Sequence, residues 1–192
     1  MSSYVYGVEI FAQNTPSLSE NTQLSSNQNT TTNWQLYSSP IYALKIKHPA
    51  TWNITEDRGN VRFREPIGVS RDGERRYAFP LTIEVMNNEQ NQTAENLIRD
   101  DMARAQSSQY NLNFKLLGTN KTTLANGMQL LQYTDTYETR LKEEIKALVG
   151  YTTSDGLVYR LDYTAYPDQF DKYLSTIKLM IDSFEPLEFG ES

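Results

Sequence analysis

The stretch YALKIKHPATWNIT, residues 42–55, decides the fold. The apolar residues Leu44 and Ile46 alternate with lysines, which is the pattern of a strand with one buried face. Pro49 has no backbone N–H to give to a strand ladder, so we expect the strand to end there. A second short strand is expected to begin at Trp52, whose large ring would anchor the sheet to a helix.

The same alternation recurs along the rest of the chain. It predicts six further strands in the runs VRFRE (61–65), LTIEV (81–85), LNFKLL (112–117), MQLLQYTDTYE (128–138), EIKALVGYTT (144–153) and LVYRLDYTAY (157–166). Asn126-Gly127 and Asp155-Gly156 are dipeptides of the kind that join hairpin strands. Residues 66–78 contain Pro66 and two glycines and are expected to form a loop.

Two amphipathic helices complete the pattern. The first is expected to begin after Thr93, a good N-cap residue, and to place Leu97 and Ile98 on its apolar face. The second is expected to begin near Pro167 and to stop before Pro186. The links between the late strands are too short for crossover helices, so the sheet must be mainly antiparallel. The sequence therefore predicts an α+β fold in which two helices cover a mainly antiparallel sheet.

Residues 1–35 differ in composition from the rest of the chain. They contain no Lys or Arg, and residues 13–33 are almost all Asn, Gln, Ser and Thr. Such a segment buries too little apolar surface to offset the entropy of ordering, so we expect a flexible polar tail. The run Tyr4–Ala12 lacks the basic start and long apolar core of a secretory signal, and it is either the remnant of one or an ordinary N-terminal segment. The predicted domain covers residues 36–192.

Composition excludes several classes of protein. The net charge of −6 and pI near 4.9 disfavour nucleic-acid binding, which requires neutralised phosphates. No apolar run approaches the ~18 residues of a membrane span. The chain has no cysteine, so disulfides, thiolate metal sites and cysteine nucleophiles are absent.

The candidates for catalysis are few. His48 is the only histidine, and no Gly-x-Ser-x-Gly nucleophile motif accompanies it, so we expect a solvent-facing residue and at most an incidental surface metal site. Asp100 and Asp101 lie about 100° apart on a helix and do not converge. Tyrosines at alternating strand positions favour sheet packing, although Tyr151, Tyr159 and Tyr163 could form a ligand box. We therefore expect no enzyme, no cofactor and no dedicated metal site.

Arginines form the one surface feature suited to recognition. Six of the ten lie between residues 58 and 76, and five acidic residues lie between residues 56 and 74. Arginine forms bidentate pairs with carboxylates on a partner, but the nearby acidic residues could neutralise the group. The candidate partner-binding residues are Arg62, Arg64, Arg71, Arg75 and Arg76.

The chain resembles the PsbP-like (Mog1/PsbP) family. The resemblance rests on the aromatic strand followed by HPATWNIT, VRFREP and LTIEV, and on the closing VYRLDYTAYPDQFDKYLSTIKLMIDSF. It covers residues 37–187 and implies a sandwich of sheet and helices. It also implies a mainly non-enzymatic role, since PsbP-like proteins are extrinsic subunits or assembly factors on the lumenal side of photosynthetic membranes and related domains are usually exported.

These observations lead to one main expectation. The protein is expected to be a monomeric, extracytoplasmic binding or assembly module that docks on a larger, membrane-associated protein complex. Its compartment would be secreted, periplasmic or pseudoperiplasmic, or the thylakoid lumen in a photosynthetic source. Two alternatives stay open: a carrier of a small ligand or metal ion in a pocket between sheet and helix, and a hydrolase.

Overall fold

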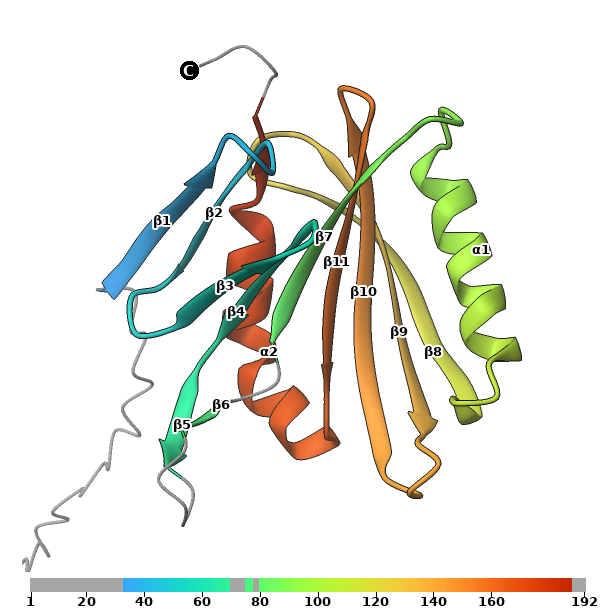
Figure 1. Ribbon diagram of the computed structural model, residues 1–192. Helices are drawn as coiled ribbons and strands as arrows, with labels where there is room; N and C mark the ends of the chain where they lie inside the picture. The colour runs from blue at the N-terminus through green and yellow to red at the C-terminus, as the bar shows by residue number, and fades with distance from the viewer. Residues whose placement is uncertain (1–32, 70–74, 78–79, 188–192) are drawn as a thin grey trace, which may run out of the picture. The chain divides into compact units, whose positions relative to one another are not determined.

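The computed structural model describes residues 33–69, 75–77 and 80–187 (Figure 1). Residues 1–32 of the predicted tail lie outside the described residues. The elements are β1 (Trp34–Ser39), β2 (Leu44–Pro49), β3 (Asn53–Asp57), β4 (Asn60–Arg64), β5 (Pro66–Val69), β6 (Arg75–Tyr77), β7 (Leu81–Asn87), α1 (Ala94–Ser107), β8 (Leu112–Thr123), β9 (Gln129–Glu138), β10 (Glu144–Ser154), β11 (Leu157–Ala165), α2 (Pro167–Asp182) and β12 (Glu185–Pro186).

The main sheet has seven strands in the order β3-β4-β7-β11-β10-β9-β8, and every neighbouring pair is antiparallel. A three-stranded sheet has the order β1-β2-β12, and β5 pairs with β6. The predicted α+β fold with a mainly antiparallel sheet is therefore confirmed. Most of the sheet is built from hairpins, as the short turns required.

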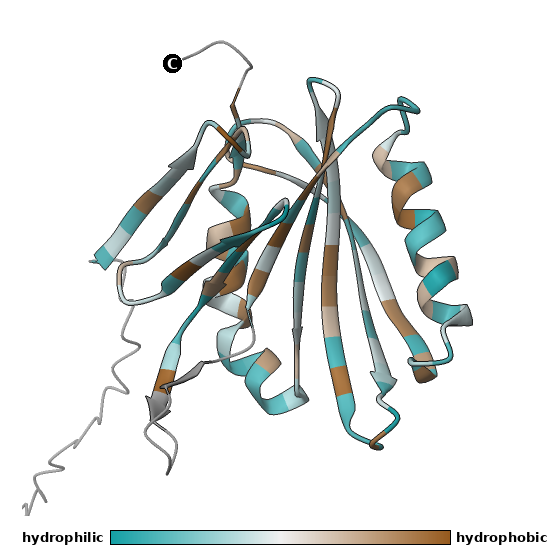
Figure 2. Ribbon diagram, in the orientation of Figure 1, coloured by the Kyte–Doolittle hydropathy of each residue, from teal (hydrophilic) through white to brown (hydrophobic). Residues whose placement is uncertain are grey.

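The two helices cover opposite faces of the main sheet. α1 lies over β9 and β10, whereas α2 packs on β10 and β11 and also contacts β2 of the small sheet (Figure 1). Hydrophobic and hydrophilic positions alternate along the strands, as Figure 2 shows. The middle strands are thus covered on both sides, so side chains on both of their faces are withdrawn from water.

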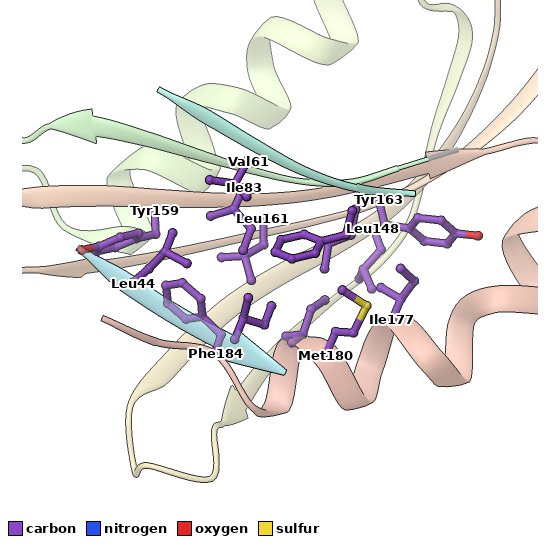
Figure 3. Packing of buried hydrophobic residues seen from close by; sticks show 14 of the residues in the cluster. Leu44, Val61, Ile83, Leu148, Tyr159, Leu161, Tyr163, Ile177, Met180 and Phe184 are labelled. Atoms are coloured by element: carbon purple, nitrogen blue, oxygen red, sulfur yellow. The ribbon is translucent and has the colours of Figure 1, made fainter. Parts of the chain in front are cut away.

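The larger hydrophobic core lies between the main sheet, α2 and β2 (Figure 3). Burial of this apolar surface is the main stabilising contribution to the fold. The residues labelled in Figure 3 are Leu44, Val61, Ile83, Leu148, Tyr159, Leu161, Tyr163, Ile177, Met180 and Phe184. A smaller core between the other face and α1 is centred on Ile98, Val149 and Tyr151.

The opening stretch folds as predicted in its backbone. β2 ends at Pro49, and β3 begins directly after Trp52. The Trp52 side chain is 6% exposed, and its ring meets the ring of Tyr173 on α2 edge-on at 6.1 Å. This confirms that Trp52 anchors the sheet to a helix.

The expectation for His48 is wrong. Its side chain is only 4% exposed, and its ring packs against that of Phe63 at 5.5 Å. His48 is buried because side chains alternate between the two faces of a strand, and His48 lies on the same face of β2 as the buried Leu44 and Ile46. His48 is therefore a core residue and not an incidental surface metal site.

Four strands were not predicted. β1 begins at Trp34, inside the predicted tail of residues 1–35, and pairs with β2. β5 and β6 form a small hairpin within the expected loop, and its pairing is irregular between Pro66 and Gly68. β12 adds two residues to the edge of β2 after the second helix. Runs this short carry too little alternation to be distinguished from loops.

Candidate functional site

The arginine candidates are only partly described. Arg62 and Arg64 lie on the same face of β4, opposite Thr55 and Asn53 of β3. The Nη1 atom of Arg62 is 3.8 Å from the Oδ2 atom of Asp57, so a local acidic residue partly neutralises it. The Nε atom of Arg64 is buried and has no hydrogen-bond partner among the described residues.

The other three arginine candidates belong to the segment that follows β4. β5 begins two residues after β4, and β6, which holds Arg75 and Arg76, pairs with it. The side chains of these two residues and all of Arg71 lie outside the described part of the structure. The arginine surface therefore stays a prediction, with Arg62 and Arg64 as its described members.

The tyrosine group does not form a single box. Tyr151 belongs to the core beneath α1, whereas Tyr159 and Tyr163 belong to the core beneath α2. The hydroxyl of Tyr159 donates to the backbone carbonyl of Ala43, and that of Tyr163 donates to the carbonyl of Gln169. These hydroxyls serve the packing of the fold, as the sheet-packing interpretation implied.

A charged pocket lies between the main sheet and α1. Its floor consists of the small side chains of Ala147 and Val149 on β10. Longer polar side chains from β9 and β11 surround this floor because the register places Asp135 and Thr164 beside Ala147, and Tyr133 and Asp162 beside Val149. The helix supplies its roof, and the resulting cavity has a volume of about 330 Å³. We call this space the α1 pocket; it is lined by Asp101, Arg104, Ala105, Ser108, Asn111, Tyr133, Asp135, Tyr137, Ala147, Val149, Arg160, Asp162 and Thr164.

Arg160 is the central cation of the α1 pocket. Its Nη1 atom is 2.7 Å from Oδ2 of Asp162 and 3.8 Å from Oε2 of Glu84. Its Nε atom is 3.6 Å from Oδ2 of Asp101. Three carboxylates thus share one guanidinium, which is partly buried on a strand in the middle of the sheet.

Asp101 and Asp162 have further partners. The Tyr133 hydroxyl donates to Oδ2 of Asp101 at 2.9 Å, and Nη2 of Arg104 lies 3.1 Å from Oδ1 of the same carboxylate. The hydroxyl of Thr164 donates to Oδ1 of Asp162 at 2.7 Å. Burial and the negative charge of Asp101 raise the pKa of Tyr133, which keeps this hydroxyl a proton donor.

Asp135 differs from the other carboxylates of the α1 pocket. It is 3% exposed, and its Oδ1 atom is buried without a hydrogen-bond partner among the described residues. Burial, with the nearby charges of Asp162 and Asp101, raises the pKa of Asp135 to about 7, against the opposing effect of Arg160. Such a carboxyl group can accept a hydrogen bond from a donor that enters the pocket.

Sequence analysis did not single out this group of residues. Arg160 and Asp162 alternate with large apolar residues on β11, which lies in the middle of a sheet with a helix on each face. Asp100 and Asp101 diverge as expected, with side chains 53% and 13% exposed. A charged residue on a strand covered on both faces is the signal that could have identified the pocket.

Other site types find no support in the described part of the chain. Within residues 33–69 and 80–187, no cluster of three or more His, Asp or Glu residues is arranged to hold a metal ion. No helix in these ranges is long and apolar enough to cross a membrane.

Comparison with known proteins supports the fold. No family model and no curated protein matches the sequence. Among solved structures, the cyanobacterial PsbP protein (CyanoP) of Synechocystis sp. PCC 6803 is similar at 19% identity and a TM-score of 0.57, over 80% of this chain and 92% of that one. A protein of unknown function from Pseudomonas aeruginosa, PA94, is similar at 12% identity and a TM-score of 0.55, over 80% of this chain and 97% of that one.

A third similar structure is LpqN, which is involved in cell envelope biogenesis of Mycobacterium tuberculosis. It is 12% identical, with a TM-score of 0.51, over 73% of this chain and 81% of that one. At these identities the likeness concerns the fold. The resemblance to PsbP-like proteins is thus confirmed at that level.

Proposed function

We propose that this protein is a non-catalytic, extracytoplasmic binding module that docks on a larger protein complex. The PsbP-like fold supports this proposal, because the resemblance implies extrinsic subunits and assembly factors. The likeness to a protein involved in cell envelope biogenesis points to the same side of the membrane. The burial of His48, the only histidine, removes the one imidazole from the solvent-accessible surface.

The observation that carries the proposal is the open edge of the main sheet at β8. This strand has twelve residues and pairs with β9 on one side, while no described strand pairs with its other side. Leu112, Leu116 and Leu117 of β8 are 41%, 44% and 47% exposed. An open edge with exposed apolar side chains favours an extended segment of a partner that adds a strand to the sheet.

The arginine surface lies toward the other edge of the main sheet. Arg62 and Arg64 belong to β4, the second strand from that edge. We propose that Arg62, Arg64, Arg71, Arg75 and Arg76 contact carboxylates of the same partner complex. Arginine is suited to this role because its planar guanidinium pairs bidentately with carboxylates.

Site-specific photo-crosslinking in the native host tests the docking surface. A photoreactive residue replaces Leu112 or Leu117 on β8 in two variants, and Ile41, an 84% exposed apolar residue in the turn before β2, in the control. We expect both β8 variants to form an adduct with the same extracytoplasmic protein and the control to form none. Identical adducts at all three positions, or none at β8, would contradict docking through this edge.

A further inference from the structure

We propose that the α1 pocket binds the ammonium group of a small amine, with the carboxylate of Asp135 as its main ligand. This inference does not depend on docking through β8, because it concerns the space between α1 and the main sheet. The argument rests on one unpartnered group, on the charges of the surrounding residues and on the shape of the pocket.

The unpartnered group is Asp135. Burying a carboxyl oxygen without a hydrogen bond is costly, so folded proteins almost always supply a partner. The fold provides partners for Asp101 and Asp162, the other two carboxylates of the pocket, but no described residue donates to Oδ1 of Asp135. The missing partner is therefore a hydrogen-bond donor that the described residues do not supply.

The charges favour a cationic donor. The pocket is lined by three carboxylates and two guanidinium groups, and the Arg104 side chain is 75% exposed and largely screened by water. Glu84 adds a fourth carboxylate next to Arg160. A single positive charge beside Asp135 reduces this excess, whereas an anion would increase the repulsion.

An ammonium group fits better than a metal ion. The described residues do not bring three metal ligands together, and the guanidinium of Arg160 lies among the carboxylates. An ammonium group has three N–H donors. The Tyr137 hydroxyl and the side-chain oxygen of Asn111 line the same pocket and can accept those that Asp135 does not.

The shape of the pocket limits the ligand to a small molecule. At about 330 Å³ the cavity lies near the lower end of the range for small-molecule sites. Larger hollows of about 500 and 640 Å³ lie near the start of α1, but no buried unpartnered polar atom of the described residues lines them. The α1 pocket is therefore the hollow in which a polar ligand would restore a missing interaction.

Binding should depend on pH. The groups that face Asp135 from the surrounding elements are Asp101 and Arg104 on α1, Tyr133 and Tyr137 on β9, and Arg160 and Asp162 on β11. Burial raises the pKa of Asp135 to about 7, so the carboxylate is mostly charged only above that pH. We expect affinity for an amine to fall at least about tenfold between about pH 8 and about pH 5.5.

The test is a titration of the full, isotope-labelled chain followed by NMR chemical shifts. The probes are ethylamine and putrescine, with tetramethylammonium as a cation that has no N–H donor, acetate as an anion, and magnesium and calcium chloride. Asp135→Asn removes the charge at constant size. Asp171→Asn, at a 66% exposed site on α2, is the matched control.

The proposal predicts saturable shifts with the two amines around α1 and strands β9 to β11. It also predicts at least about tenfold weaker binding in Asp135→Asn and with tetramethylammonium, and unchanged binding in Asp171→Asn. Equal affinity in Asp135→Asn, no saturable shift with either amine, or shifts produced by the metal ions alone would overturn it. If Asp135→Asn fails to fold, the pH dependence of amine binding by the natural chain decides the question, because affinity unchanged between about pH 8 and about pH 5.5 also overturns the proposal.

Discussion

The hydroxyl of Tyr159 on β11 donates a 2.8 Å hydrogen bond to the backbone carbonyl of Ala43, in the turn before β2. The same carbonyl accepts the backbone N–H of Leu187 at 2.8 Å. Ala43 has a positive φ of 47°, a conformation that is uncommon for residues other than glycine. One carbonyl group thus ties a middle strand of the main sheet and the end of the described chain to a turn of the small sheet.

Tyr159→Phe should lower the free energy of unfolding by about 1 kcal/mol, the usual net value of one hydrogen bond. The ring remains and keeps its contact with Phe184, whose centroid is 5.2 Å away. Urea unfolding measures the change, and Tyr110→Phe, at a 58% exposed tyrosine, is the control. Equal stability of the Tyr159→Phe variant and the natural chain would mean that the hydrogen bond contributes nothing.

Trp52→Ala should cost about 3–5 kcal/mol of stability, because it removes a large buried ring and leaves a cavity against Tyr173. Thermal or urea unfolding measures the loss. Ile41→Ala, at an exposed apolar residue, should change stability by no more than about 0.5 kcal/mol. A small effect of Trp52→Ala would contradict its role as the anchor between sheet and helix.

His48 should make the protein sensitive to acid. Burial lowers the pKa of His48 below its usual value of 6.5, although a hydrogen bond with the Pro49 carbonyl opposes the shift. The unfolded chain therefore binds a proton at a higher pH than the folded chain, and stability falls as the pH drops below about 6.5. His48→Leu should reduce this acid-dependent loss, measured by urea unfolding at about pH 7.5 and about pH 5.5.

A second substitution of His48 tests its contribution to core packing at neutral pH. His48→Ala should cost about 1–3 kcal/mol, since it empties a site next to Phe63. An acid-dependent loss that is the same in the natural chain and in His48→Leu would assign the titration to other groups.

Asp135 should have the opposite pH dependence. Its folded pKa of about 7 lies above its usual value of 3.8, so the folded chain holds a proton that the unfolded chain releases. The contribution of Asp135 to the free energy of unfolding is greatest below about pH 4 and is lost as the pH rises through about 7. Asp135→Asn should therefore raise stability by about 1–3 kcal/mol at about pH 8 and by less at about pH 5.

Unfolding of Asp135→Asn at these two pH values, without any amine present, measures this difference. Asp171→Asn should leave the pH dependence unchanged because Asp171 is exposed on the other face. A destabilised Asp135→Asn at high pH would show that the carboxylate already has a favourable environment in the free protein.

Arg62→Glu should weaken docking if the arginine surface contacts carboxylates of the partner. The substitution reverses the charge and places a carboxylate near Asp57, so we expect at least a threefold lower yield of the adduct formed from β8. Arg99→Glu, at a 68% exposed arginine on α1, is the matched control. Equal yields from both variants would remove Arg62 from the docking surface.

The sequence predicts the backbone of this fold better than its buried charges. The alternation in β2 and the turn signals at Gly127 and Gly156 specify strands and hairpins locally, and the structure has both, although residues 124–128 make the first link longer than two residues. Local patterns do not show which face of a strand is exposed to solvent, because exposure depends on the elements that pack against the strand. His48 was expected to face solvent, and it is instead buried against Phe63 of another strand.

The α1 pocket illustrates the same limit. Its residues come from α1, β9, β10 and β11, and each of them has an ordinary local context in the sequence. Only the register of three strands brings Asp135, Ala147 and Thr164 into one row. Local patterns cannot predict that register, since it is fixed by long-range packing.

The order of strands in the main sheet has a consequence for synthesis of the protein. β11 lies between β7 and β10, so β7 and β4 stay separated from the later hairpins until residues 157–165 have been made. β12, which closes the small sheet on β2, is made later still. Pairing across such sequence distances is slow, because the entropy of closing a long loop opposes it. The main sheet of the nascent chain therefore stays incomplete until β11 has been made, which is compatible with the export that the proposed function requires.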